Sequence, residues 1–248
     1  MLYPLAVAVI SALFAGTVLN QFATRGHAHQ LIWTVALGMS AVASAAYVLA
    51  LPPTASTTAF RTYYALGAVL MPAWLGLGSI FLVAARRFAD WCAAGLLAAS
   101  ALAVSSVSNA GLDTRAFAGL NGGPGSGILT PGPWLPLTII LNTLGVVAVV
   151  GVAIYSAVRV VQRKGSGRLL LANVCIAVGD LIVGVAGSMA RTGHPELFWI
   201  TMLVGWIVIF AGFLLTQPRL ATSAGSRLDT GLSSPQPSPL PAERTPVA

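Results

Sequence analysis

The chain has 248 residues, of which 56% are hydrophobic and only 8% are charged, and its mean hydropathy is +0.84. A water-soluble domain carries about 25% charged residues, so this chain lacks the polar side chains to cover a surface in water, and lipid is expected to be its main solvent. The net charge of +7 does not indicate a nucleic-acid-binding protein, because the basic residues lie between apolar segments and form no stripe with interleaved aromatics.

Seven apolar segments follow one another along the chain, each of about 18–25 residues, which is the length needed to cross the hydrocarbon core. The first has no Lys or Arg before it, so it is expected to be a retained span rather than a signal peptide. Continuous apolar runs favour helices over barrel strands. The expected spans are residues 3–20, 30–51, 62–85, 91–108, 134–158, 169–190 and 197–217. The sequence therefore predicts an all-α, polytopic transmembrane bundle of seven helices.

The segments that connect the spans differ in positive charge. Ten Lys or Arg residues fall on one side of the membrane, counting the C-terminal tail, and three fall on the other. The side with three has Arg61, Arg115 and Arg191. Because cytoplasmic loops carry the excess of Lys and Arg, the N-terminus is expected outside and the C-terminus in the cytoplasm.

Two segments have a different composition. Residues 109–133 are rich in Gly and Pro, too polar and broken for a span, and are expected to form an outside loop. Residues 218–248 are rich in Ser, Pro and Thr and are expected to be a disordered cytoplasmic tail. The expected organisation is a transmembrane domain, residues 1–217, followed by this tail.

Asp180 is the one acidic residue well inside an expected span. A charged group at that depth costs at least about 2.5–3.5 kcal/mol, so a partner or a role must compensate for it. Helical spacing places Asn173 and Asp180 on one face of the sixth span, and Asn142 of the fifth span lies at a similar depth, as a candidate partner. Pro72, midway along the third span, is expected to kink it and open a cavity.

These polar residues allow two interpretations. One is a ligand-binding pocket in the outer half of the bundle, and the other is a hydrogen-bonded network that only holds the helices together. The candidate ligand-binding residues are Asp180, Asn142, Asn173, Ser105 and Asn109.

No catalytic set is recognisable, so an enzyme is the least favoured class. No intramembrane His or Lys is placed to activate a serine, and Asp180 has no second intramembrane carboxyl with which to form a dyad. On a helix, His27 and His29 would point in different directions, and His194 lies at the opposite membrane face. We therefore expect no haem, no metal and no other cofactor.

Aromatic and basic residues near the span boundaries have simple explanations. Six aromatic residues are expected to belong to the aromatic belt at the membrane surface: Tyr63, Tyr64, Trp91, Trp134, Phe198 and Trp199. The cluster Arg159, Arg163, Lys164 and Arg168 is a candidate contact for anionic lipid or a cytoplasmic partner protein, although topology alone accounts for it.

Three stretches carry a family resemblance: TRGHAHQLIWTVALGMSAVASAAYVLA, FRTYYALGAVLMPAWLGLGSIFLVAARR and ARTGHPELFWITMLVGWIVIFAGFLL. They resemble uncharacterised seven-span membrane proteins of high-GC bacteria such as actinobacteria, over most of the membrane part but not the tail. The resemblance implies seven spans and a bacterial plasma membrane, and it implies no activity.

Two functional hypotheses remain. The favoured one is a non-enzymatic, receptor-like or partner-binding membrane protein, because no catalytic set or internal repeat is present and polar residues gather in the outer half. The alternative is a small-solute or proton-coupled transporter that uses Asp180 as its titrating group.

Overall fold

The computed structural model describes residues 2–191 and 194–217, which form helices and contain no β-strand. Seven spans in these ranges are long and apolar enough to cross a membrane, which confirms the predicted fold class. The spans are α1 (Leu2–Arg25), α2 (Ala28–Ala50), a composite third span, α5 (Arg86–Asn109), α7 (Trp134–Gln162), α8 (Gly167–Arg191) and α9 (Phe198–Thr216). The composite span joins α3 (Thr57–Tyr63), the π-helix η1 (Tyr64–Leu70) and α4 (Met71–Val83). The expected tail, residues 218–248, lies outside the described residues.

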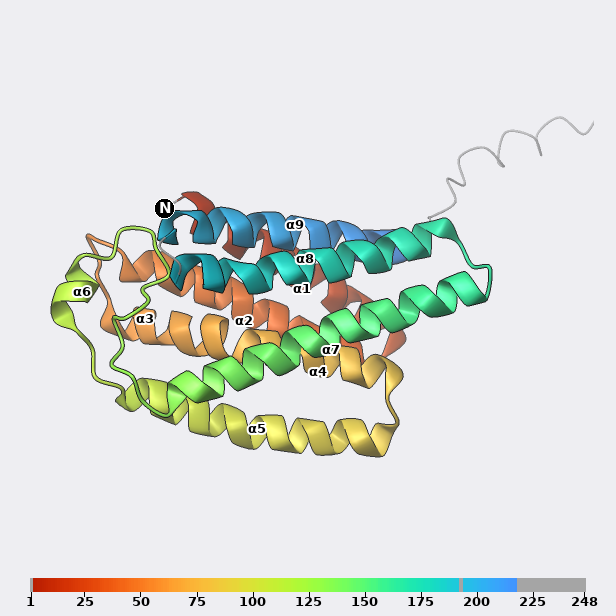
Figure 1. Cartoon of the computed structure of the whole chain (residues 1–248), viewed down its shortest axis with the longest axis horizontal. Coiled ribbons are helices and arrows are strands. Elements are labelled where there is room, and N and C mark those ends of the chain that lie inside the picture. The colour runs from red at the N-terminus through yellow and green to blue at the C-terminus, as the bar shows by residue number, and fades with distance from the viewer. Residues whose placement is uncertain (1, 192–193, 218–248) are drawn as a thin grey trace, which may run out of the picture. The chain divides into compact units, whose positions relative to one another are not determined.

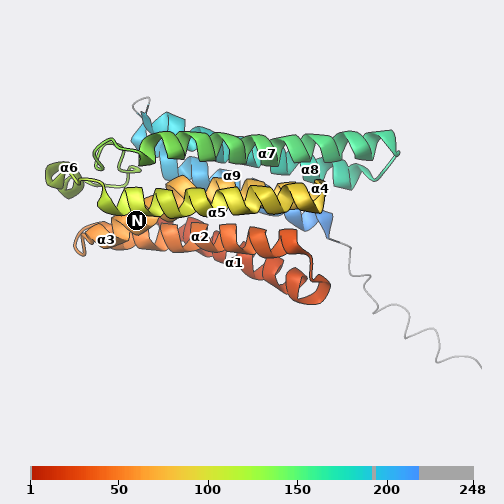
Figure 2. The same cartoon turned by 90° about the horizontal axis from the view of Figure 1, so that it is seen from below.

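Six of the described spans form a closed ring. Around this ring α1 packs against α2, α2 against α4, α4 against α7, α7 against α8, α8 against α9, and α9 against α1. Helix α5 lies outside the ring, against η1, α4 and α7, along one edge of the bundle in Figure 1. Figure 2 shows α1 and α2 on one side of the bundle and α7 and α8 on the other. The ring therefore encloses an interior that α5 does not reach.

Large apolar side chains cover the outside of the bundle. Leu13, Leu102, Leu144 and Val147 are each at least 60% exposed, and they belong to three different spans. A protein in water rarely exposes so wide an apolar surface, so these side chains fit contact with lipid.

Glycines let two pairs of helices approach closely. A Cβ at Gly145 of α7 would lie 2.3 Å from the carbonyl oxygen of Pro72 in α4, so the two backbones are in contact there. In α8 and α9, a Cβ at Gly179 would lie 2.9 Å from the carbonyl oxygen of Gly205. Small residues at such crossings are the usual means of packing helices in membranes, where no hydrophobic force drives association.

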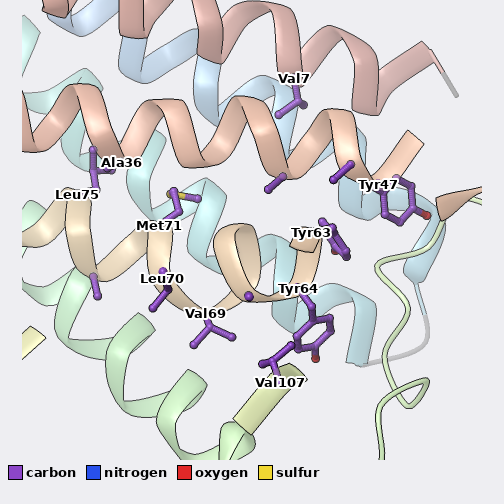
Figure 3. Packing of buried hydrophobic residues seen from close by; sticks show 14 of the residues in the cluster. Val7, Ala36, Tyr47, Tyr63, Tyr64, Val69, Leu70, Met71, Leu75 and Val107 are labelled. Atoms are coloured by element: carbon purple, nitrogen blue, oxygen red, sulfur yellow. The ribbon is translucent and has the colours of Figure 1, made fainter. Parts of the chain in front are cut away.

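The third span departs from regular α-helix just before Pro72. Pro72 has no N–H to donate to the carbonyl of Ala68 four residues earlier, and its ring would collide with that carbonyl in a regular helix. The π-helix η1 occupies the preceding turns, so the third span is disturbed next to Pro72, where a kink was predicted. Its Val69 and Leu70 are buried, and Figure 3 shows them among core side chains of neighbouring helices. Irregular backbone is tolerated at membrane depth when protein surrounds it in this way.

Candidate ligand-binding site

A cavity of about 680 Å³ lies between the helices of the ring and reaches side chains exposed on the outer surface, such as Val147 of α7 and Val185 of α8. Its walls come from α2, η1, α4, α7, α8 and α9, and the cap segment, defined here as residues 110–133, lines one end. Ligand pockets are commonly about 300–1,000 Å³, so the space suits a small organic molecule. Most of the lining is apolar, with a few polar side chains that include Ser44, Asn142 and Asp180.

Asp180 lines this cavity without a partner. Its side chain is buried, with a relative exposure of 5%, and its Oδ2 has no hydrogen-bond partner in the described part of the chain. No Arg, Lys or His is among the described residues that line the cavity. The carboxyl group is therefore a buried acidic group for which the described lining supplies no counter-charge.

The close crossing of α8 and α9 positions Asp180. Gly179 and Gly205 touch at this crossing, and Asp180 and Trp206 are the residues that follow them in the two helices. Both side chains line the cavity, and the indole Nε1 of Trp206 is buried without a hydrogen-bond partner among the described residues. The crossing thus brings an unpaired acceptor and an unpaired donor to the same cavity.

Asn142 also lines the cavity, but it does not pair with Asp180. Its Nδ2 donates to the carbonyl oxygen of Ala68, at 2.9 Å, across the α7–η1 contact. The expected Asn142–Asp180 partnership is therefore wrong, because Asn142 instead serves the carbonyl that Pro72 cannot serve. The Oδ1 atom of Asn142 stays buried without a partner in the described ranges, so this amide keeps one unsatisfied acceptor.

The other candidate residues lie away from the cavity. Ser105 and Asn109 are exposed at the end of α5, outside the ring, and Asn109 Nδ2 donates to the Ser105 carbonyl at 2.8 Å. Asn173 Nδ2 donates to the Leu169 carbonyl within α8, also at 2.8 Å. The structure therefore brings Asp180 and Asn142 to one cavity and leaves the other three outside it.

The cap segment is seated on buried aromatic side chains. The Tyr47 hydroxyl donates to the Gly123 carbonyl, and the Tyr63 hydroxyl donates to the Pro124 carbonyl at 3.2 Å. Gly125 has φ +75°, and a Cβ there would lie 2.6 Å from Cε2 of Phe60. The glycines that marked this segment as a loop therefore allow its backbone to turn and to lie directly on the aromatic rings.

Other contacts hold the cap segment at its two ends. The helix α6 (Thr114–Ala118) begins at Asp113, whose Oδ1 accepts from the N–H groups of Arg115 and Ala116. Leu112 and Leu129 form an antiparallel bridge. At the base of the segment, the Arg61 guanidinium donates to the carbonyls of Val107, Ser108 and Ala110 at 2.6–2.8 Å. A cation at a helix C-terminus satisfies carbonyls that have no partner within the helix.

The predicted aromatic belt is wrong for four of its members. Tyr63, Tyr64, Trp134 and Trp199 are each less than 10% exposed, so they face protein instead of the membrane surface. Tyr63 and Trp199 lie with ring centroids 5.9 Å apart, and Tyr64 and Trp134 lie 5.1 Å apart. Sequence position near a span boundary does not distinguish a lipid-facing ring from one that supports a loop.

The two neighbouring histidines also differ from expectation. His27 precedes α2 and has extended backbone, φ −83° and ψ 130°. The different side-chain directions expected for His27 and His29 on one helix therefore do not apply. The two ring centroids are 5.5 Å apart, beside a smaller cavity of about 210 Å³ that Arg86 also lines. Among the described residues, no group of three or more His, Cys, Asp or Glu is placed to hold a metal ion.

These features define an integral, multi-pass membrane protein with a central cavity. Comparison of the chain with known protein families, with curated proteins and with solved structures finds no match. The cavity and its side chains are therefore the features of this chain that bear on its function.

Proposed function

We propose that this chain is a non-enzymatic, receptor-like membrane protein that binds a small molecule in its central cavity. The observation that carries the proposal is the buried Asp180 carboxyl, which lines a cavity of about 680 Å³. Its Oδ2 has no hydrogen-bond partner among the described residues, and no described Arg, Lys or His lines the cavity with it. An unpaired carboxyl at membrane depth is costly, and a bound ligand that supplies the missing partner would offset that cost.

The free donor and acceptor groups favour a ligand site over a purely structural network. A network that only joined helices would satisfy its members with one another. Here Asp180 Oδ2, Asn142 Oδ1 and Trp206 Nε1 are all buried without partners in the described ranges, and all three residues line the same space. A mostly apolar wall with a few unpaired polar groups is the common composition of small-molecule sites.

The test is a thermal-shift screen of a small-molecule library against the purified protein in nanodiscs. We expect some compounds to raise the Tm of the wild type, by several degrees at about 100 times Kd, because a ligand that binds only the folded state stabilises it. Asp180→Asn should lose this response, whereas Ser105→Ala, which changes an exposed residue outside the cavity, should keep it. Equal responses in the wild type and Asp180→Asn would place the binding elsewhere and contradict the proposal.

The proposed receptor passes its signal to another component at the end of the bundle opposite the cap segment. The supporting feature is the connection between α7 and α8, where Arg159, Arg163 and Lys164 are exposed and Arg168 is half-buried. We propose that this cluster contacts a cytoplasmic partner protein or anionic lipid headgroups, to which clustered basic side chains are attracted.

We further propose a bacterial plasma membrane, with the N-terminus and the cap segment outside. The helix order places seven of the ten Arg and Lys residues of the described ranges at the end of the bundle away from the cap segment. The other three, Arg61, Arg115 and Arg191, lie toward the cap end, and an excess of Lys and Arg is typical of the cytoplasmic side. In a chain without Cys92 and Cys175, Thr114→Cys should react with a membrane-impermeant maleimide in intact cells. Ser166→Cys should react only after lysis, and the reverse pattern would invert the topology.

A second candidate function is transport of a small solute or of protons. The observation in its favour is also Asp180, since a carboxyl group without a protein counter-charge can pick up and release a proton as a coupling group. In proteoliposomes, this function predicts pH-dependent uptake that Asp180→Asn abolishes. Uptake that is unchanged in Asp180→Asn would remove this candidate.

A further inference from the structure

We propose that the cavity takes an organic cation, a protonated amine carried on an apolar or aromatic body. This inference rests on the proposed function, because it names the chemical class of the ligand for the same cavity. Asp180 would act as the counter-ion of the ammonium group, and the aromatic side chains of the cavity wall would hold both the cation and the body of the molecule.

The first argument is the charge balance of the cavity. Among the described residues, Asp180 is the one carboxyl group in the lining, and no Arg, Lys or His lines the cavity with it. A buried charge is strongly unfavourable until a charge of opposite sign meets it, and in a poorly solvated space the attraction between the two is much stronger than in water. The lining therefore favours a ligand with one positive charge over neutral ligands and opposes anions.

The second argument is the aromatic wall. Tyr63, Trp199 and Trp206 all line the cavity, and all three are buried. Indole and phenol rings attract ammonium groups through their faces and offer a large apolar surface to the rest of a ligand. Because Asp180 and Trp206 follow the two glycines in contact at the α8–α9 crossing, the carboxyl group and an indole ring come to the cavity from adjacent positions.

The third argument is the position of the remaining polar groups. Asn142 Oδ1, an acceptor, and Asp180 Oδ2 are both buried without partners in the described part of the chain. An ammonium group has several N–H donors, and it can serve more than one acceptor at once. By contrast, a carboxylate ligand would offer only further acceptors to these oxygens.

The experiment uses three probes that share an indole-ethyl skeleton: tryptamine, the neutral alcohol tryptophol and the anion indole-3-propionate. Binding to the full chain in nanodiscs of uncharged lipid is measured by isothermal titration calorimetry, and the signal from empty nanodiscs is subtracted. Uncharged lipid is needed because an anionic surface would attract the amine by itself. The variants are Asp180→Asn, Asp180→Glu, which keeps the charge, and Ser105→Ala as a control outside the cavity.

We expect tryptamine to bind the wild type at least about 10-fold more tightly than tryptophol, and indole-3-propionate to bind most weakly. Asp180→Asn should weaken tryptamine binding at least about 30-fold, since one partner of a buried charge pair is removed, and should change tryptophol binding by less than about 3-fold. Asp180→Glu should retain the preference for the amine. Ser105→Ala should match the wild type for all three probes.

Two results would overturn the amine class in different ways. If tryptophol or indole-3-propionate binds the wild type as tightly as tryptamine, the ligand is not a cation, but the cavity remains a ligand site. If none of the three probes binds, the amine class is again excluded for this skeleton size, and the library screen with Asp180→Asn decides separately whether the cavity binds any ligand.

Discussion

Gly145→Ala is expected to destabilise the protein by about 3 kcal/mol or more, or to prevent folding. The added Cβ would lie 2.3 Å from the carbonyl oxygen and 2.4 Å from the carbonyl carbon of Pro72, and 2.9 Å from the backbone nitrogen of Ala73. All three atoms belong to the backbone, so no side-chain rotation can relieve the overlap. Helix α7 would have to move away from α4, and the cost of such overpacking lies at the upper end of the range for single substitutions.

Gly151→Ala provides a matched control in the same helix. A Cβ at Gly151 meets nothing within 4 Å, so this change should be neutral or stabilise by up to about 1 kcal/mol through the higher helix propensity of Ala. Thermal unfolding of both variants in one detergent gives the comparison. Similar stabilities for Gly145→Ala and Gly151→Ala would mean that α4 and α7 do not touch at Pro72.

The α4–α7 crossing also controls the shape of the cavity. Pro72 lines the cavity, and Asn142, one helical turn before Gly145 on the same face of α7, lines it as well. A displacement of α7 would therefore change the crossing and the binding site together. We expect a Gly145→Ala protein that still folds to lose ligand binding along with stability.

The sequence alone was sufficient for the spans and for part of the site. Apolar length determines a membrane helix directly, since the hydrocarbon core has a fixed thickness, and all seven expected spans overlap those of the structure. The importance of Asp180 followed from the cost of an acidic group at that depth. The cavity that it lines depends on the contacts of four other spans and a loop, which no local pattern in the sequence contains.

Long-range partners were the part that could not be predicted. Tyr63 and Trp134 lie near span boundaries, as belt residues do, but Tyr63 holds the backbone of the cap segment through Pro124. The glycines of residues 121–127 indicated a turn, and only the folded chain shows that Gly125 allows close contact with Phe60. Asn142 was paired with Asp180 only because the two residues lie at a similar depth in the membrane. The sequence does not show toward which neighbouring helix each side chain points.

The sequence left two interpretations open, a binding pocket and a structural network, and the Asn142 side chain has features of both. Its Nδ2 donates to the Ala68 carbonyl of η1 and so links α7 to the third span. Its Oδ1 is a buried acceptor without a partner in the described ranges, on a residue that lines the cavity. Pro72 explains why this hydrogen bond is needed, since a residue with a backbone N–H at position 72 could donate to the Ala68 carbonyl itself. The structural role can therefore be measured separately from any ligand.

Asn142→Ala is expected to cost about 1–2 kcal/mol of stability in the wild-type background, because it leaves a carbonyl in the protein interior with one donor fewer. In a Pro72→Ala background the backbone N–H of residue 72 becomes available to Ala68, so the same change should cost less than about 0.5 kcal/mol. The four unfolding free energies form a double-mutant cycle, and a coupling of about 1 kcal/mol is the expected result.

Asn173→Ala is the control for this cycle, since Asn173 donates to Leu169 within its own helix and is not among the residues that line the cavity. Its effect should be the same with Pro or Ala at position 72. If Asn142→Ala costs as much in the Pro72→Ala background as in the wild type, then the Ala68 carbonyl does not depend on Asn142 for the donor that proline removes. Asn142 would then stabilise the protein through contacts other than its hydrogen bond to the Ala68 carbonyl.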